Sequence, residues 1–222
     1  MRIARHLNGP PDSGQGGYVA GSLAVRLPGP GADVWLRAPA PLETDLEERV
    51  TDAHIQLWDG DRLIAEADAL DQVVADPVPF VLLERAETAS RRYPGQVATD
   101  EYGTCFSCGW LRDDGLGIRP GPVGEGLVAC VWNPRGRVAQ EWIWSALDCV
   151  TGWAWPLAET LLVTGRLTGG LLTDEALDPV GPYIAVGAQL RQEGRKHVSA
   201  AALFTAGGIQ VAAIRGTWLK LG

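Results

Sequence analysis

An acidic residue lies in the middle of a strongly apolar stretch of sequence. Asp148 belongs to the segment 139–155, which contains four tryptophans and several aliphatic residues. Apolar residues fall on all sides of the helix that this segment predicts, and such a helix is buried. Burying an isolated carboxylate costs much free energy, so Asp148 has to be paired, protonated or used in chemistry. A structural carboxylate, bonded to backbone groups or to an arginine, is the alternative to a catalytic one.

Two adjacent glycines mark the start of another predicted helix. Residues 8–17 form a loop rich in glycine and proline, and a helix follows over 16–27 with Ser13 as its expected N-cap. The first amides of a helix lack partners and carry partial positive charge, and Gly16 and Gly17 leave them open to close approach. Such amides could polarise a substrate carbonyl while a carboxylate opposite acts as base or nucleophile. Alternatively, the glycines serve only to pack the helix against a sheet.

The cysteines and histidines indicate no further site. Cys105 and Cys108 have the spacing of metal ligands, but no second Cys pair or His pair stands at finger-like spacing. We therefore expect no metal, and we interpret the cysteine pair as structural. The three histidines show no spacing typical of a Ser/His/Asp triad. No P-loop or dinucleotide-binding motif is present either.

The same order of elements occurs twice along the chain: a loop, a helix, then strands that end in a hairpin. The first copy spans 1–75 and the second 120–222, separated by a linker, 76–119, that carries the cysteine pair and one short helix near 81–90. The second helix covers 139–155. The expected strands are 33–37, 46–51, 53–58 and 62–70 in the first copy, and 161–167, 183–190, 197–204 and 209–219 in the second.

Composition restricts the class of partner. The chain has 222 residues and a formal charge of −8, which argues against a broad electrostatic grip on nucleic acid or on a membrane surface. No segment predicts a membrane span or an apolar signal core, so we expect a cytoplasmic protein with reduced cysteines. A small molecule is the expected partner. Sheet edges left unpaired would allow a homodimer or a higher homo-oligomer.

Three groups of residues resemble hotdog-fold acyl-CoA thioesterases of the phenylacetyl-CoA thioesterase type. Asn8-Gly9…Gln15-Gly16-Gly17-Tyr18…Leu23-Ala24 is similar to that family's Asn…His-Gly-Gly…Leu-Asp motif, and Asn133…Ser145-Ala146-Leu147-Asp148 resembles its later part. Cys105-Phe106-Ser107-Cys108-Gly109…Gly115-Leu116 resembles a Cys-x-x-Cys-Gly…Gly-Leu segment of several hotdog thioesterases. The resemblance covers nearly the whole chain. It implies an α+β tandem (double) hotdog with two antiparallel sheets, each wrapped around a long apolar helix.

The two copies keep complementary parts of the motif. In the family the catalytic Asp follows the His by nine residues, which gives Ala24 in the first copy and Asp148 in the second. The first copy thus keeps the glycines and lacks the acid, whereas the second keeps the acid and lacks the glycines. Because single-hotdog relatives form their site between two subunits, the resemblance implies one intact site, in which Asn8, Gly16 and Gly17 face Asp148. The reciprocal site, at Glu141 and Ala24, would be inactive.

The resemblance implies acyl-CoA thioester hydrolysis, with no cofactor beyond coenzyme A as part of the substrate. Asp148 would be the base or nucleophile, and the amides of Gly16 and Gly17 would polarise the carbonyl. The remaining expected contacts with substrate come from Asn8, Gln15, Tyr18, Trp142, Trp144, Arg195 and Lys196, the last two reaching coenzyme A phosphates. Gln15 replaces the family's His. A non-catalytic binder of acyl-CoA or another small molecule, and a hotdog dehydratase or hydratase, are the alternatives.

Overall fold

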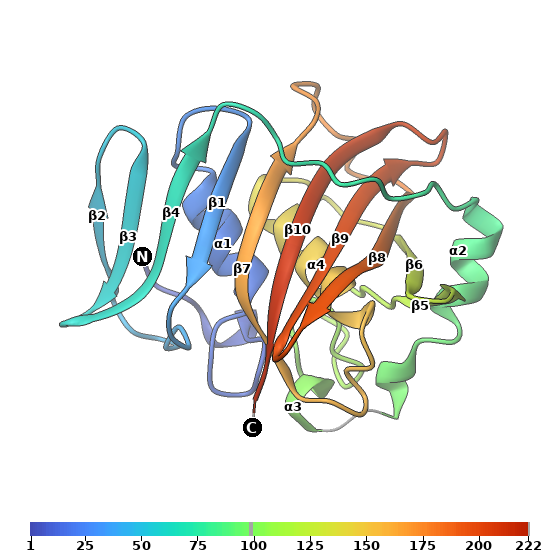
Figure 1. Ribbon diagram of the computed structural model, residues 1–222, viewed down its shortest axis with the longest axis horizontal. Helices are drawn as coiled ribbons and strands as arrows, with labels where there is room; N and C mark the ends of the chain where they lie inside the picture. The colour runs from blue at the N-terminus through green and yellow to red at the C-terminus, as the bar shows by residue number, and fades with distance from the viewer. Residues whose placement is uncertain (98–99, 222) are drawn as a thin grey trace.

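A computed structural model describes residues 1–97 and 100–221. Within these residues one continuous antiparallel sheet of ten strands forms the body of the molecule, in the order β2-β3-β4-β1-β7-β10-β9-β8-β6-β5 (Figure 1). The strands of its first part are β1 (Gly31–Leu36), β2 (Glu47–Val50), β3 (His54–Asp59) and β4 (Arg62–Leu70). Those of its second part are β5 (Gly121–Gly124), β6 (Leu127–Trp132), β7 (Leu162–Leu171), β8 (Tyr183–Glu193), β9 (Lys196–Thr205) and β10 (Gln210–Lys220).

The two parts of the sheet repeat one strand order. Helix α1 (Gly16–Ala24) precedes β1, and helix α4 (Gln140–Trp153) precedes β7. From the centre outward, each part then places its first strand after the helix, followed by its fourth, third and second. The parts join where β1 pairs antiparallel with β7, for example Val34 opposite Leu167. In each part, a helix is therefore followed by four strands that take the same order in the sheet.

The sheet corrects one part of the expected architecture. We expected two sheets, but pairing of β1 with β7 makes them one, because each of these strands would otherwise leave a row of unpaired backbone groups at an edge. Helices α1 and α4 lie together behind this sheet in Figure 1. The first helix has nine residues and so is shorter than the expected 16–27.

The two helices approach each other unusually closely at glycines. A Cβ atom at Gly17 would stand 2.4 Å from the backbone oxygen of Trp144, and one at Gly21 would stand 2.6 Å from the Cα of Glu141. Ile143, Trp144 and Leu147 of α4 are fully buried. The contact between α1 and α4 therefore needs glycine on one side and fixes where each helix points its polar residues.

The opposite face and the edges of the sheet are covered by smaller elements. The segment 71–82 crosses the face turned to the viewer in Figure 1, where Arg215 forms an ion pair with Asp76. It leads to α2 (Leu83–Ser90), which packs on β5 and β6. Three short helical turns complete the described chain: η1 (Arg5–Leu7), η2 (Pro94–Gln96) and α3 (Asp100–Gly103).

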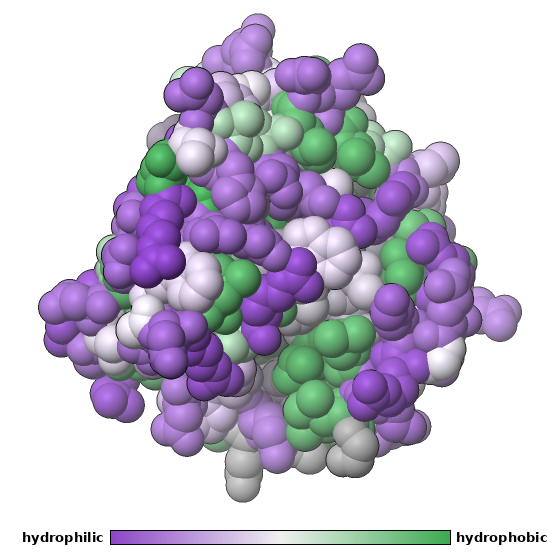
Figure 2. All heavy atoms as spheres, turned by 60° about the vertical axis from the view of Figure 1, so that its left-hand side comes forward, coloured by the Kyte–Doolittle hydropathy of each residue, from purple (hydrophilic) through white to green (hydrophobic). Residues whose placement is uncertain are grey.

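Both edge strands are short and poorly suited to pairing with another chain. Edge strand β2 carries Glu47, Glu48 and Arg49, and the face of the molecule at this end is mainly hydrophilic with separate hydrophobic patches (Figure 2). Edge strand β5 contains Pro122. Charges and proline at an edge oppose strand addition. No helix among the described residues combines the length and apolar character required to cross a membrane.

Candidate active site

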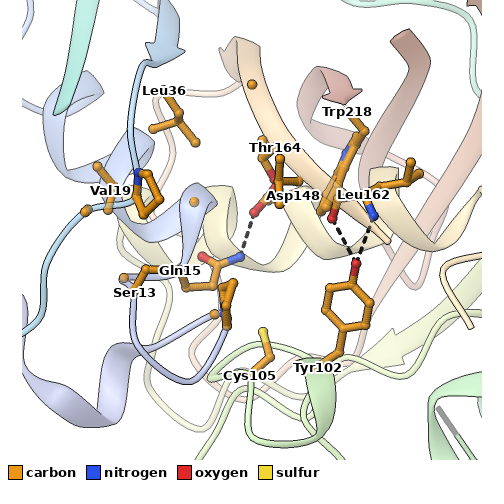
Figure 3. A pocket seen from close by; sticks show the side chains of 18 of the residues that line it. Ser13, Gln15, Val19, Leu36, Tyr102, Cys105, Asp148, Leu162, Thr164 and Trp218 are labelled. Atoms are coloured by element: carbon orange, nitrogen blue, oxygen red, sulfur yellow. Dashed lines mark hydrogen bonds between the residues drawn. The ribbon is translucent and has the colours of Figure 1, made fainter. Parts of the chain in front are cut away.

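Asp148 lies at the contact between the two helices, and three donors hold its carboxylate. Its side chain is 2% exposed. Oδ2 accepts hydrogen bonds from the Gly17 amide (2.8 Å) and from Gln15 Nε2 (2.7 Å), as Figure 3 shows for Gln15. Oδ1 accepts one from Thr164 Oγ1, in β7, at 2.8 Å. The carboxylate of the second copy is thus held by the helix start of the first copy, as the complementary motifs predicted.

Burial controls the acidity of this group. Removal from water raises the pKa of Asp148 to about 7, and the hydrogen bonds from Thr164, Gly17 and Gln15 oppose that rise. A carboxylate with a pKa near neutrality takes up a proton more readily than an exposed one. Such a group is suited to general base chemistry.

Gln15 caps the helix and orients the acid at once. Its Oε1 accepts from the Tyr18 amide (2.6 Å) and from Ser145 Oγ (2.8 Å). Because both donors use the oxygen, the amide nitrogen must face Asp148. Gln15, rather than the expected Ser13, is the N-cap of α1. The correction has a physical reason. Gln15 directly precedes the first helical residue, whereas Ser13 lies two residues before Gln15 and forms an isolated β-bridge with Pro41.

The two glycines have different surroundings. A Cβ atom at Gly16 would lie 3.0 Å from Leu36 Cδ1 and 3.3 Å from Asp148 Oδ2, at the wall of a cavity. Gly17 packs against the backbone of α4, and its amide is already bonded to Asp148. Gly16 is therefore the glycine whose backbone borders the space beside the carboxylate.

The cavity has a volume of about 560 Å³ and a mainly apolar wall. Gln15, Asp148 and Thr164 supply polar groups at one place in this wall, and Figure 3 shows them between the two helices and β7. Much of the remaining wall is apolar or aromatic: Val19, Leu36, Tyr102, Trp153, Leu157, Leu162, Val163, Trp218, Leu219 and Leu221. A concave apolar space with a few convergent polar groups is the usual form of a small-molecule site.

Four other expected site residues lie away from this wall. Asn8 is buried, donates to Thr104 Oγ1 and accepts from Arg112 Nη1, so it ties the first loop to the linker. Tyr18 and Trp142 contact each other with ring centroids 5.3 Å apart. Trp144 is fully buried against α1. The structure brings none of these four side chains to the cavity beside Asp148.

The expected basic pair lies beside the cavity rather than in its wall. Arg195 and Lys196 are exposed at the hairpin between β8 and β9. The carbonyl of Arg195 accepts a hydrogen bond from the amide of Lys220 at 2.9 Å. Lys220 stands between two residues of the cavity wall, Leu219 and Leu221. The hairpin is therefore a neighbour of the cavity.

No motif or spacing in the sequence pointed to Thr164 or Tyr102. Thr164 lies in the strand after α4, and only the packing of β7 against that helix brings it to Asp148. The Tyr102 hydroxyl donates to the carbonyl of Leu162 at 2.8 Å and accepts from its amide at 3.1 Å (Figure 3). Tyr102 therefore anchors the linker to the start of β7, and burial raises its pKa to about 12.

Comparison with known proteins shows a clear likeness in structure. The tesB protein of Mycobacterium avium subspecies paratuberculosis is 12% identical, with a TM-score of 0.62 over 97% of this chain and 91% of that one. A conserved hot dog fold protein from Alicyclobacillus acidocaldarius is 12% identical, with a TM-score of 0.63 over 100% of this chain and 92% of that one. The acyl-CoA thioesterase II TesB2 from Mycobacterium marinum is 13% identical, with a TM-score of 0.52 over 94% and 90%.

The comparisons of sequence found no relative. No protein-family model matches the chain, and no curated protein matches it. The structural likeness extends over nearly the full length of each of the three chains. This chain therefore has the hotdog fold, as its motifs predicted.

Proposed function

We propose that this protein hydrolyses acyl-CoA thioesters in the cavity beside Asp148. One observation carries the proposal: a buried carboxylate, held in place by the first turn of another helix, borders a mainly apolar cavity. An acyl group fits the apolar part of such a wall, and the carboxylate can act on the thioester next to it. The TesB2 protein of similar fold is named an acyl-CoA thioesterase, which supports this choice of substrate class.

Asp148 acts on water as a general base in this proposal. Oδ1, which receives one hydrogen bond against two at Oδ2, is the oxygen with more capacity to take a proton. The activated water attacks the carbonyl carbon, and the C–S bond then breaks as the proton passes to the leaving sulfur. The products are a carboxylic acid and free coenzyme A. Direct attack by the carboxylate is the other route open to the same group.

The Gly16 amide is the donor that we assign to the carbonyl oxygen. The Gly17 amide is bonded to Asp148 and the Tyr18 amide to Gln15, while the Gly16 amide donates no hydrogen bond to any of the described residues. Gly16 borders the cavity at the start of α1, where the helix presents partial positive charge. One such donor stabilises a developing oxyanion by about 2.7–4 kcal/mol.

The basic hairpin is suited to the phosphates of coenzyme A. Arg195 and Lys196 are exposed next to the residues of β10 that form part of the cavity wall. Coenzyme A carries several negative charges, and lysine and arginine are the side chains that bind phosphate. The acyl group would then lie inward and the nucleotide outward, over the hairpin.

The test is thiol release from a panel of acyl-CoA substrates by the wild-type protein and by Asp148→Asn. We expect release by the wild type and a loss of at least 100-fold in the variant, roughly the effect of losing a general base. Asp33→Asn, which alters a carboxylate of β1 outside the cavity wall, is the matched control and should keep its turnover. Equal rates for wild type and Asp148→Asn would reject the assignment.

Thermal shift with the same panel separates hydrolysis from binding. A rise in Tm with acyl-CoA, without any thiol release, would identify a non-catalytic binder. Product analysis for added or lost water across a double bond would detect a hydratase or dehydratase. Release of one thiol per acid formed supports the hydrolase.

A further inference from the structure

Three cysteine thiols from distant parts of the chain meet in the interior. Cys105 and Cys108 come from the linker and Cys149 from α4, and their three Sγ atoms all lie within 4.8 Å of one another. Each residue is at most 5% exposed, and all are free thiols. The sequence shows only the first two as a pair, because the third stands 41 residues later and is brought in by packing.

The separations suit one tetrahedral ion. A zinc–sulfur bond is about 2.3 Å, so two thiolates on one tetrahedral zinc lie about 3.8 Å apart. The Sγ atoms of Cys105 and Cys149 are 3.8 Å apart, and the widest separation in the group is at most 4.8 Å. Small rotations of the cysteine side chains, moving each Sγ atom by less than about 1 Å, would complete the geometry.

The turn that carries two of the thiols is held rigidly. The Gly109 amide donates to the carbonyl of Cys105 at 2.7 Å, and a Cβ atom at Gly109 would stand 2.4 Å from that oxygen. The Tyr93 hydroxyl donates to the carbonyl of Cys108 at 3.0 Å. A preformed turn reduces the entropy lost when an ion binds.

A fixed positive charge stands beside the turn. The guanidinium of Arg119 donates to the carbonyl of Cys108 at 2.8 Å and to that of Gly109 at 3.0 Å. Three thiolates on a divalent ion leave a net charge of −1, which a neighbouring guanidinium compensates. Buried thiols that only fill space need no such partner.

The fourth coordination position faces the cavity. Cys105, Cys108 and Cys149 all form part of the cavity wall. Within residues 1–97 and 100–221, no further His, Cys, Asp or Glu ligand atom joins the group. A site with three protein ligands and one open position is the form in which zinc binds water or a small ligand.

We propose that Cys105, Cys108 and Cys149 bind one zinc ion, with a small molecule from the cavity as the fourth ligand. The site uses soft thiolate ligands, which favour zinc over magnesium or calcium. It does not depend on thioester hydrolysis, because the same three residues would hold the ion in a binder.

The test measures metal content and metal spectra of the full-length protein. After purification under reducing conditions without chelator, we expect about one zinc per chain by elemental analysis. Removal of zinc and addition of Co²⁺ should give intense near-ultraviolet sulfur-to-cobalt bands and visible bands of tetrahedral type. Cys149→Ser should weaken zinc binding at least about tenfold in a chelator competition, since even the loss of an outer-shell contact has that effect.

Cys130→Ser is the matched control. Cys130 is equally buried, is a free thiol and stands outside the group of three, so its replacement should leave zinc binding and the cobalt spectrum unchanged. Should Cys149→Ser fail to fold, the cobalt spectrum of the wild type still reports the thiolates. Reduced protein with four titratable thiols that neither retains zinc nor gives the cobalt bands would overturn the proposal.

Discussion

Alanine at each of the two adjacent glycines should separate packing from chemistry. A methyl group at Gly17 would meet the Trp144 oxygen at 2.4 Å, the Asp148 Cβ at 2.5 Å and the Ser145 Cα at 2.8 Å. Two of these three atoms are backbone, which cannot rotate away, so α1 and α4 must move apart by about 1 Å to reach ordinary contact distances. Overpacking of this kind typically costs about 1–3 kcal/mol, and the upper end applies because backbone is met.

A methyl group at Gly16 meets a different environment. Its nearest neighbours are Leu36 Cδ1 at 3.0 Å, Thr164 Cβ at 3.2 Å and Asp148 Oδ2 at 3.3 Å, all in side chains. A shift of a few tenths of an ångström relieves these contacts, so the stability should change by less than about 1 kcal/mol. The methyl would nevertheless occupy the space beside the carboxylate, where we place the thioester.

Thermal unfolding and thiol release together decide the matter. For a chain of this size 1 kcal/mol shifts Tm by about 2–4 °C, so Gly17→Ala should lower Tm by about 6–12 °C. Gly16→Ala should keep a Tm within about 4 °C of the wild type and lose turnover. The reasoning fails if Gly17→Ala has the same Tm as the wild type, or if Gly16→Ala keeps full turnover with every acyl-CoA of the panel.

Three further perturbations test other parts of the structure. Gln15→Ala should lower both stability, by about 2 kcal/mol or more, and turnover, because it removes the helix cap and a hydrogen bond to Asp148; a wild-type urea midpoint would contradict this. Arg195→Gln with Lys196→Gln should raise KM for acyl-CoA and leave kcat unchanged, and the difference should shrink in high salt; an unchanged KM at low salt would remove the hairpin from the site. Burial tends to raise the pKa of Asp33, but hydrogen bonds from Arg166 and Thr168 lower it below its ordinary value. The stability from this pair is therefore full above about pH 4 and is lost as the pH falls through the folded-state pKa, so acid unfolding of Arg166→Met should show a weaker pH dependence in that range.

Local patterns predicted the elements of this fold better than their assembly. The strand 62–70 and the helix around Asp148 follow from alternation and from apolar periodicity, and both are present. Strands β5 and β6 were not predicted. Gly121, Pro122 and Gly124 make the sequence of β5 typical of a turn, so the hairpin that β5 forms with β6 was missed. The joining of the two parts into one sheet depends on β1 meeting β7, a contact between residues more than 100 positions apart that no local pattern encodes.

The site shows the same division. The complement between Gly16-Gly17 and Asp148 was readable because a motif gives spacing within each copy. Thr164 and Cys149 were not, because a threonine in a strand and a cysteine in an apolar helix have no unusual neighbours in sequence. Their position depends on how α4 rotates over the sheet and the linker, which the close contact with α1 at Gly17 sets.

Alanine at position 24 and alanine at position 139 are physically consistent with each other. The positions equivalent to Gln15 and Asp148 are Ala139 and Ala24, since each pair is related by the same spacing of nine residues. Ala139 caps α4 without any side-chain hydrogen bond, and Ala24 is 5% exposed. An acid at position 24, with alanine still at 139, would be buried without a hydrogen-bond donor. A glutamine at position 139, with alanine still at 24, would be a buried donor without an acceptor. Each of these arrangements costs about 1–3 kcal/mol. Loss of either residue therefore makes the other a burden on folding, whereas loss of both leaves an ordinary apolar contact.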